Sequence, residues 1–305
     1  MKNIFVRFIA TACILASSVL TQAAERELIP RPLPPDTLLS LQPRCDFIIN
    51  RFWDRCNFEQ AFLYPQELNS AFGEWIGIMP YASADTVHSS IDRLIARFAK
   101  SGPNTLKIAE LAENWLYSDT AQFHSEEIYL PFAKAAASHK KISKAEKARF
   151  AQQAKVIETS GLGMTLPPLP FVRPDGTKGT LAEANSGSVL IFINDPDCSD
   201  CNLARIRLSA DINANQLIRE GGLTIVSIYP GDPSDEEWKN AAASYPDNWI
   251  VCAMPDADLY FDLRETPLFI FLNKAHKVLA KNMPIDHFLN AFRIANSAQT
   301  TQRNE

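Results

Sequence analysis

The sequence lacks an excess of basic residues and shows no cluster of lysine and arginine. Its 305 residues include 30 Lys and Arg against 35 Asp and Glu, which gives a net charge of -5. Nucleic-acid-binding domains carry a basic patch or stripe, so the composition argues against a nucleic-acid partner. With 46% hydrophobic and 21% charged residues, the chain can nevertheless bury a core, which excludes a disordered polymer.

Histidine is also scarce, with five residues that lie far apart in the chain. A structural zinc site needs four ligands, usually supplied by two close pairs of Cys or His. The C-terminal half has one close pair, Cys198 and Cys201, and neither His276 nor His287 forms a second. We therefore expect no metal site and no cofactor.

Long apolar runs are absent after the first residues, because no later stretch reaches the roughly 18 apolar residues of a spanning helix. The start reads "IFVRFIATACILASSVL", with basic residues near its beginning and the small-residue stretch "TQAAE" after it. This pattern is typical of a signal peptide, here residues 1–24, with cleavage after Ala23 or Ala24. The alternatives are an uncleaved membrane anchor and lipidation of Cys13, which the Ala10 three positions earlier disfavours. We expect an exported protein that meets the membrane only through export or that anchor.

Export makes disulfides persistent, so the cysteine count is informative. Six cysteines less Cys13 leave five, and an odd number means that at least one is unpaired or pairs between chains. Cys45 and Cys56 are eleven positions apart with no helix breaker between them, a spacing of about 16 Å on one helix. A disulfide needs Cα atoms within about 7 Å, so we expect no bridge there. Cys252, in "WIVCAM", is expected to be a buried strand residue.

The N-terminal half is expected to be helical. After a proline-rich arm over residues 25–43, expected to be extended and poorly packed, residues 44–159 show helical periodicity and no strand alternation. The first such helix buries Val87, Ile91, Leu94, Ile95 and Phe98, and a second buries Leu106, Ala109, Leu111 and Trp115. A third opens with the capping box Ser143/Glu146 and ends at Gly161.

Aromatic side chains in this half favour a helical bundle. The run "RFWDRCNF" could also form a platform for a peptide or a sugar, but a packed core is the simpler interpretation. The expected core aromatics are Phe52, Trp53, Phe58 and Trp75.

The pattern changes near residue 160. Four short, β-branched apolar segments follow, "SVLIFIN", "LTIVSIY", "WIVCAM" and "PLFIFLN", with helical patterns between and after them at residues 202–214, 234–244 and 284–295. Alternating strands and helices predict a partly parallel sheet with helices on its faces. We expect this domain to span residues 160–297, with a hairpin at "PDGTKGTL" and a disordered tail at 298–305.

The pair Cys198-Ser199-Asp200-Cys201 lies between the first of these strands and a helix. A cysteine at a helix N-terminus faces unpaired N–H groups and the positive end of the dipole, and both stabilise a thiolate. Such a pair beside a βαβ pattern indicates a redox motif, and the alternative is an inert structural disulfide.

Two segments carry a resemblance to a known family. "LPPLPFVRPDGTKGTLAEANSGSVLIFINDPDCSDC" and "ETPLFIFLNKAHKVLAKN" resemble the thioredoxin-like superfamily, in particular its extracytoplasmic TlpA/ResA-like branch, over residues 163–297. The resemblance implies an α/β thioredoxin-like fold, with a central mixed sheet and helices on both faces, after an all-α domain. It implies thiol–disulfide exchange in which Cys198 attacks and Cys201 resolves. Pro267 would be a cis proline facing the disulfide, and Thr266 would offer its backbone to a substrate.

The helical half resembles, over "FWDRCNF" and the helices after it, a domain of unknown function that precedes thioredoxin-like domains in Gram-negative envelope proteins. That resemblance carries no known site. It supports the two-domain organisation and implies nothing about chemistry. From the signal-like start and the thioredoxin-like resemblance together, we expect a periplasmic protein that acts on protein thiols or disulfides. A reducing role would need a recycling partner, which we expect to be a membrane electron carrier.

The chain departs from the family around the cysteines. Asp197 stands where tryptophan is usual, and Asp195 and Asp200 add further carboxylates, which disfavour a thiolate and so raise a cysteine pKa. A less stabilised thiolate gives a less oxidising couple, which favours a reductase. Glu220 and Glu265 are weak candidates for the proton acceptor of Cys201. The rival class is a thioredoxin-fold binding module with a static disulfide; a peroxidase-like relative is disfavoured because no Thr/Arg set accompanies the cysteine.

Overall fold

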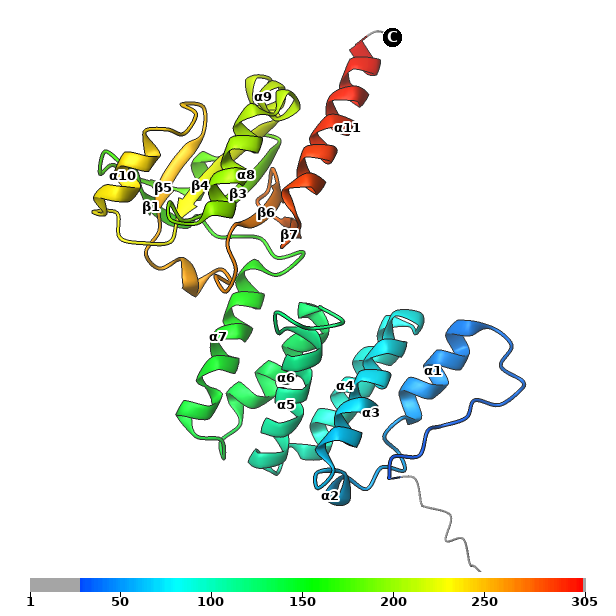
Figure 1. Cartoon of the computed structure of the whole chain (residues 1–305). Coiled ribbons are helices and arrows are strands. Elements are labelled where there is room, and N and C mark those ends of the chain that lie inside the picture. Colours follow the sequence, from blue (N-terminus) through cyan, green and yellow to red (C-terminus); the bar gives the residue numbers. More distant parts are fainter. Residues whose placement is uncertain (1–27, 304–305) are drawn as a thin grey trace, which may run out of the picture.

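A computed structural model of the chain describes residues 28–303, so the expected signal peptide and Cys13 lie outside the described residues. The first half is helical, and its helices stand side by side in a row (Figure 1), in which α5, α6 and α7 pack on their neighbours in the chain while α1 packs chiefly on α4. They are α1 (Leu41–Arg51), α2 (Phe58–Ala61), α3 (Pro65–Ile78), the 3₁₀ helix η1 (Met79–Tyr81), α4 (Ala84–Phe98), α5 (Gly102–Leu116), α6 (Glu126–Ser138) and α7 (Lys144–Ser160).

One continuous apolar core runs through this row, and it contains all four expected aromatic residues. The face predicted for α4 is confirmed for Val87, Ile91, Leu94 and Phe98, which are buried, and Ile95 is partly buried. On α5, Ala109 is the one buried residue of the four that were predicted. Ile108, Ala112 and Leu116 are buried with it, whereas Leu106, Leu111 and Trp115 are only partly buried. The capping box that opens α7 is present, and Gly161 caps its other end.

The proline-rich arm differs from the expectation of poor packing. Ile29 is only 3% exposed and belongs to the core. Arg31 binds Glu74 of α3 at 2.6 Å and lies over the Phe52 ring. The arm is irregular only to Ser40, since α1 begins at Leu41.

Cys45 and Cys56 are both unpaired and buried, so the expected absence of a bridge is confirmed. The reason differs from the sequence argument, because α1 ends at Arg51 and the two residues do not share a helix. Turns follow Arg51, where the Phe52 and Trp53 rings enter the core.

The second half is built on a seven-stranded mixed sheet with the order β2-β1-β5-β4-β3-β6-β7. Parallel pairs join β3 to β4 and β4 to β5, and the other pairs are antiparallel. The strands are β1 (Pro170–Val172), β2 (Lys178–Thr180), β3 (Ser188–Ile193), β4 (Leu223–Tyr229), β5 (Ile250–Ala253), β6 (Leu268–Asn273) and β7 (Val278–Lys281). The expected hairpin is β1–β2, and Cys252 is a fully buried residue of β5.

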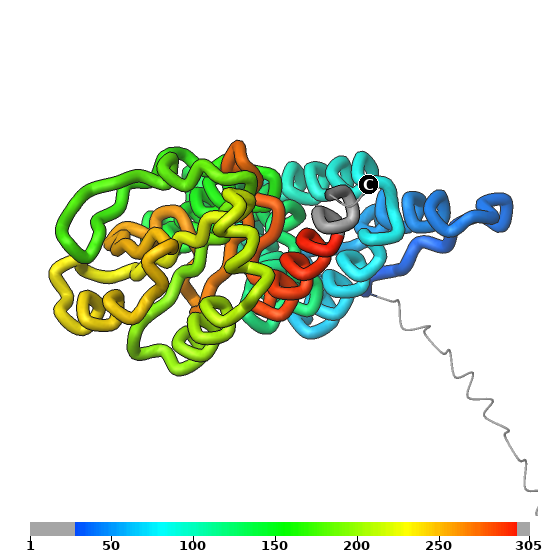
Figure 2. Tube along the Cα trace, turned by 90° about the horizontal axis from the view of Figure 1, so that it is seen from above, coloured from blue at the N-terminus to red at the C-terminus, as the bar shows by residue number. Residues whose placement is uncertain are grey.

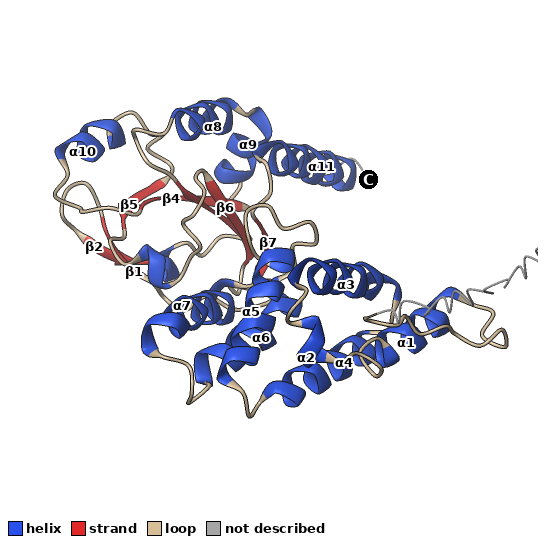
Figure 3. Ribbon diagram, turned by 60° about the horizontal axis from the view of Figure 1, so that its bottom comes forward, coloured by secondary structure: helices blue, strands red, loops and turns tan. Residues whose placement is uncertain are grey.

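The two faces of the sheet are covered differently. The α-helices α8 (Ser199–Ala210), α9 (Ile212–Arg219), α10 (Glu236–Ala242) and α11 (Ile285–Arg303) lie on one face (Figure 3). On the opposite face the helices are the short 3₁₀ turns η2 (Leu181–Glu183) and η3 (Ala257–Leu259), packed with residues from the segment before β1.

Two helix boundaries in this half differ from the sequence prediction. The segment predicted as one helix over 202–214 breaks at Asp211, whose carboxylate accepts the N–H of Ala214 at 2.7 Å and starts α9. The tail predicted as disordered from residue 298 continues α11 through Arg303, since no glycine or proline interrupts it. No helix within residues 28–303 is long and apolar enough to cross a membrane. From above, α1 and α10 lie toward opposite ends of an elongated molecule (Figure 2).

Candidate functional site

The two cysteines at the start of α8 form a disulfide, with their Cα atoms 5.1 Å apart. They follow β3 through a short loop, and Cys198 is the N-cap residue of α8. Cys198 is partly exposed, whereas Cys201, one turn into the helix, is only 2% exposed. A partner thiol can therefore reach the first sulfur more readily than the second.

The backbone around Cys198 stabilises negative charge on its sulfur. The N–H of Cys201 points at Cys198 Sγ over 3.1 Å, in the position where a capping oxygen would accept a hydrogen bond. The positive end of the α8 dipole acts in the same direction. Both effects favour a thiolate at Cys198 once the disulfide is reduced.

Carboxylates around the loop act in the opposite direction. Asp195 accepts the N–H of Asp197 at 2.9 Å, and Asp200 lies in the first turn of α8. The negative charge of Asp197, together with a hydrogen bond to it, raises the pKa of Glu237 on α10. The structure thus gathers acidic groups from two elements beside the disulfide.

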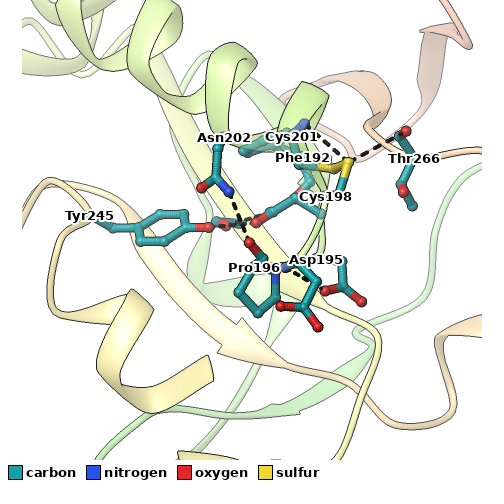
Figure 4. Close-up of a disulfide and its surroundings, with 11 residues drawn as sticks. Phe192, Asp195, Pro196, Cys198, Cys201, Asn202, Tyr245 and Thr266 are labelled. Carbon is teal, nitrogen blue, oxygen red and sulfur yellow. Dashed lines mark hydrogen bonds between the residues drawn. A yellow bond between two sulfur atoms is a disulfide. The ribbon is translucent and has the colours of Figure 1, made fainter. Parts of the chain in front are cut away.

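Thr266 and Pro267 lie opposite the cysteines, and the peptide bond between them is cis, as predicted. The Thr266 carbonyl oxygen is 3.8 Å from Cys198 Sγ. Figure 4 shows Thr266 facing the disulfide from the loop that enters β6. The structure therefore brings all four residues singled out from the sequence to one place.

A polar network that the sequence alone does not predict holds the loop before Cys198. The buried Asn194 amide donates to Ser227 Oγ at 2.8 Å, and the Tyr245 hydroxyl donates to the Asn194 carbonyl oxygen at 2.5 Å. Asn202 of α8 donates to the Pro196 carbonyl at 2.8 Å (Figure 4). The signal for Asn194 was an amide ending an apolar run, but its partners are 33 and 51 positions away.

Neither candidate proton acceptor for Cys201 is a buried acid. Glu220 is exposed at the end of α9, and Glu265 is exposed in the loop before Pro267. The fully buried ring on the strand behind the cysteines is Phe192, stacked on Phe269 at 5.0 Å. Among residues 28–303, no group of His, Cys, Asp or Glu side chains is arranged to hold a metal ion.

A cleft of about 690 Å³ lies beside the disulfide, between the two halves of the chain. Asp200, Leu203 and Pro267 line it from the sheet half, and the loop between α5 and α6 lines it from the helical half. The residues of that loop region are Tyr117, Ser118, Asp119, Ala121 and His124.

Arg264 joins the two walls of the cleft. Its guanidinium pairs with Asp262 at 2.5 Å and with Asp119 at 2.9 Å, and donates to the Tyr117 carbonyl at 3.0 Å. It also lies 4.4 Å from the centre of the Tyr117 ring. Burial raises the pKa of Asp262, but hydrogen bonds and the charge of Arg264 outweigh it and hold that pKa below its usual value.

A second, buried contact joins the halves. Lys281 of β7 pairs with Glu126, the first residue of α6, at 2.7 Å, and the side chains are 5% and 8% exposed. Between the same two halves, the Gln152 amide of α7 donates to the Asp258 carbonyl in η3 at 2.6 Å. These contacts fix the helical half against the sheet half next to the disulfide.

Comparison with known structures identifies the fold. The crystal structure of a thioredoxin-like protein from Bacteroides caccae superposes with a TM-score of 0.72, covering 87% of this chain and 98% of that chain at 24% identity. The C-terminal half has a thioredoxin-like fold. The predicted fold class is therefore confirmed, including the helical region that precedes the sheet.

Other matches cover less of the chain. The C-terminal domain of an uncharacterized protein from Bacteroides fragilis is 27% identical and covers 43% of this chain and 96% of that one, with a TM-score of 0.40. The thioredoxin domain of a thiol-disulfide oxidoreductase from Bacteroides vulgatus is 22% identical and covers 43% and 95%, with a TM-score of 0.36. A family model described as "Domain of unknown function (DUF5106)" matches residues 18–160. No curated protein matches.

Proposed function

We propose that the protein reduces disulfides in exported proteins by thiol–disulfide exchange. The observation that carries the proposal is the asymmetry of the pair: a partly exposed Cys198 caps α8, and a buried Cys201 lies one turn behind it. This arrangement suits attack by the first sulfur and release by the second.

In the proposed reaction the reduced Cys198 thiolate attacks a substrate disulfide. A bond forms between Cys198 and one substrate sulfur, the substrate S–S bond breaks, and the departing thiolate takes a proton. Cys201 then attacks Cys198 Sγ and releases the second substrate thiol. Two electrons pass to the substrate, and the protein is left with the Cys198–Cys201 disulfide. A dithiol electron donor, which we propose to be a membrane carrier, restores the reduced form.

The acidic surroundings support the reducing direction. Carboxylates near Cys198 oppose the helix dipole, so the dithiol form gains less from thiolate stabilisation than it would in a strong oxidant. Thr266 and Pro267 would bind the substrate backbone next to the reacting sulfur, which the 3.8 Å between the Thr266 carbonyl and Cys198 Sγ supports. A periplasmic location is part of the proposal and depends on the signal-like residues 1–24.

The second candidate is a binding module in which the disulfide is static. The partial exposure of Cys198 favours thiol–disulfide exchange over this scaffold role, because a purely structural disulfide does not need a solvent-exposed sulfur atom.

The reduction potential of the pair tests the proposal. The mature protein is equilibrated with a dithiothreitol or glutathione series and alkylated, with Cys198→Ser as the control. We expect a potential between roughly -270 and -180 mV, toward the lower end for a reductase. A pair that stays oxidised below about -300 mV would establish the scaffold role instead.

A trapping experiment adds a second readout. Cys201→Ser should accumulate mixed disulfides through Cys198, since the resolving thiol is missing, whereas Cys198→Ser should accumulate none. Equal trapping by the two variants would contradict the assigned roles.

A further inference from the structure

We propose that the cleft between the helical half and the disulfide is a substrate-binding cleft for an extended protein segment that carries lysine or arginine beside its reactive cysteine. The inference rests on the proposed exchange function and adds the substrate class. It also gives the helical half a role, because that half supplies one wall of the cleft.

The cleft is large enough and close enough for this role. Its volume of about 690 Å³ falls in the range of roughly 300–1,000 Å³ that binding pockets occupy. Pro267 lines it, and so does Asp200, which lies between the two cysteines. A segment whose cysteine meets Cys198 Sγ would therefore place its neighbouring side chains in the cleft.

The wall from the helical half is held in place. Arg264 binds Asp119 and the Tyr117 carbonyl on that wall while pairing with Asp262 on its own side. The buried pair between Lys281 and Glu126 is a second tie. Because Lys281 and Arg264 both line the cleft, the contacts that join the halves also shape the site.

The Lys and Arg side chains that line the cleft are all paired with carboxylates, so they do not neutralise the remaining acidic side chains of the lining. Three cations line the cleft, and each already pairs with carboxylates: Arg207 with Asp286, Arg264 with Asp262 and Asp119, and Lys281 with Glu126.

Two carboxylates that line the cleft have no partner among the described residues. Within residues 28–303, neither Asp200 nor Glu265 has a side-chain hydrogen bond or an ion pair, and both are exposed. A lysine or arginine of the substrate would pair with them, whereas an anionic substrate such as glutathione would be repelled.

Apolar groups complete the lining. Leu203 of α8 is 57% exposed and Met283 is 38% exposed, and both line the cleft together with Pro284. Such surfaces accommodate the aliphatic stems of lysine and arginine while the charged ends reach carboxylates. A protein segment, rather than a small thiol, supplies both features together with an extended backbone for Thr266.

The test uses two synthetic peptides that differ only in the residues flanking one cysteine, lysine in one and glutamate in the other. Each cysteine is joined by a disulfide to thionitrobenzoate, whose release is followed by colour. The reduced full-length mature protein reacts in a single turnover, and dithiothreitol gives the intrinsic rate ratio of the two peptides. We expect the protein's Lys-to-Glu rate ratio to exceed that of dithiothreitol by about tenfold at low salt, and to fall toward it at high salt.

Variants locate the effect. In Asp200→Asn/Glu265→Gln the Lys-to-Glu ratio should fall to within about twofold of the dithiothreitol ratio. The ratio of the two peptide rates is measured because a change in the reactivity of Cys198 affects both rates equally and cancels in the ratio. Ala121→Trp, which fills the cleft from the helical wall, should lower the peptide rates about fivefold relative to the rate with hydroxyethyl disulfide. Ala145→Trp, exposed in the first turn of α7, should leave both rates unchanged.

A ratio equal to that of dithiothreitol, or a preference for the glutamate peptide, overturns the inference while exchange itself stands. So do equal effects of Ala121→Trp and Ala145→Trp. Failure of the proposed function looks different, because the reduced protein would then react with neither peptide nor hydroxyethyl disulfide.

Discussion

At Cys198, two electrostatic effects oppose each other. The helix N-terminus favours the thiolate by about 0.3–1 kcal/mol, and by up to about 2 kcal/mol where it is partly buried. The Asp195, Asp197 and Asp200 carboxylates disfavour it, and the raised pKa of Glu237 beside Asp197 shows that negative charges crowd this loop. The reactivity of the first sulfur therefore depends on single carboxylates that can be removed one at a time.

Asp197→Asn should lower the pKa of the reduced Cys198 thiol by about half a unit to one unit, because one repelling charge is lost. The reaction with a neutral disulfide at pH 7 should become faster, and the reduction potential should rise. The measurement is the thiolate ultraviolet absorbance of the reduced protein as a function of pH. Asp92→Asn, exposed on α4, is the control; equal pKa values in both variants would show that the dipole alone sets the reactivity.

The unpaired cysteines should behave differently from the pair. Burial raises the pKa of Cys252, and it raises the pKa of Cys56 to about 11. At pH 8 these thiols stay protonated and are shielded from reagents. After reduction of the native protein, iodoacetamide should label Cys198 first and reach Cys56 and Cys252 only on denaturation, as read by peptide mass mapping. Rapid labelling of Cys252 in the native protein would contradict its burial.

At the scale of helices and strands, the sequence predicts those elements whose apolar residues recur at a regular local spacing. The strands β3 to β6 and the face of α4 follow from short apolar runs and helical spacing. The break at Asp211 was missed, because its N-cap role depends on one side-chain hydrogen bond inside a continuous helical pattern. The buried face of α5 differs from the predicted one because apolar residues occur around most of that helix. Only packing on neighbouring helices selects Ile108, Ala112 and Leu116 for the core.

For the site, the cysteines and Thr266–Pro267 could be predicted because a motif carries them. The cleft could not, because Arg264 meets Asp119, and Lys281 meets Glu126, only after the two halves dock. Their contacts join positions up to 155 residues apart. Neither composition nor periodicity encodes such pairings.

The close packing of α3 on α5 gives a prediction at this scale. A methyl group on Gly73 would overlap the ring of Trp115, whose indole N–H donates to Asn69 at 3.0 Å. Gly73→Ala should therefore destabilise the protein by about 1–3 kcal/mol through overpacking, despite gaining up to about 1 kcal/mol of helix propensity. Gly77→Ala, one turn later, meets Phe123 at 3.3 Å and should be close to neutral. Urea unfolding followed by tryptophan fluorescence compares them, and equal midpoints would rule out the clash.

At the scale of the whole molecule, export is a prediction that the described residues do not address. If residues 1–24 form a signal peptide, the mature protein begins at Ala24 or Glu25. N-terminal sequencing of the protein from a fractionated Gram-negative host measures this directly, with the Cys13→Ser variant as a control for lipidation. An intact Met1 in the membrane fraction would indicate an uncleaved anchor instead.

A buried ion pair, Lys281 with Glu126, joins the helical half to the sheet half, and it predicts how substitutions at the contact change the stability of the protein. Lys281 and Glu126 are almost fully buried, and the second oxygen of Glu126 has no hydrogen-bond partner among the described residues. Removing one partner of such a pair leaves an uncompensated buried charge and typically costs about 3–5 kcal/mol, whereas replacing both by apolar groups costs far less. Lys281→Met should therefore lower the free energy of unfolding more than Lys281→Met/Glu126→Leu does.

Urea unfolding of the wild type, Lys281→Met and Lys281→Met/Glu126→Leu measures this difference. The single variant should unfold at the lowest urea concentration, because it alone retains a buried carboxylate without its partner. Equal losses in both variants would mean that Glu126 becomes hydrated when Lys281 is removed, and that the two halves are held together chiefly by the Arg264 contacts.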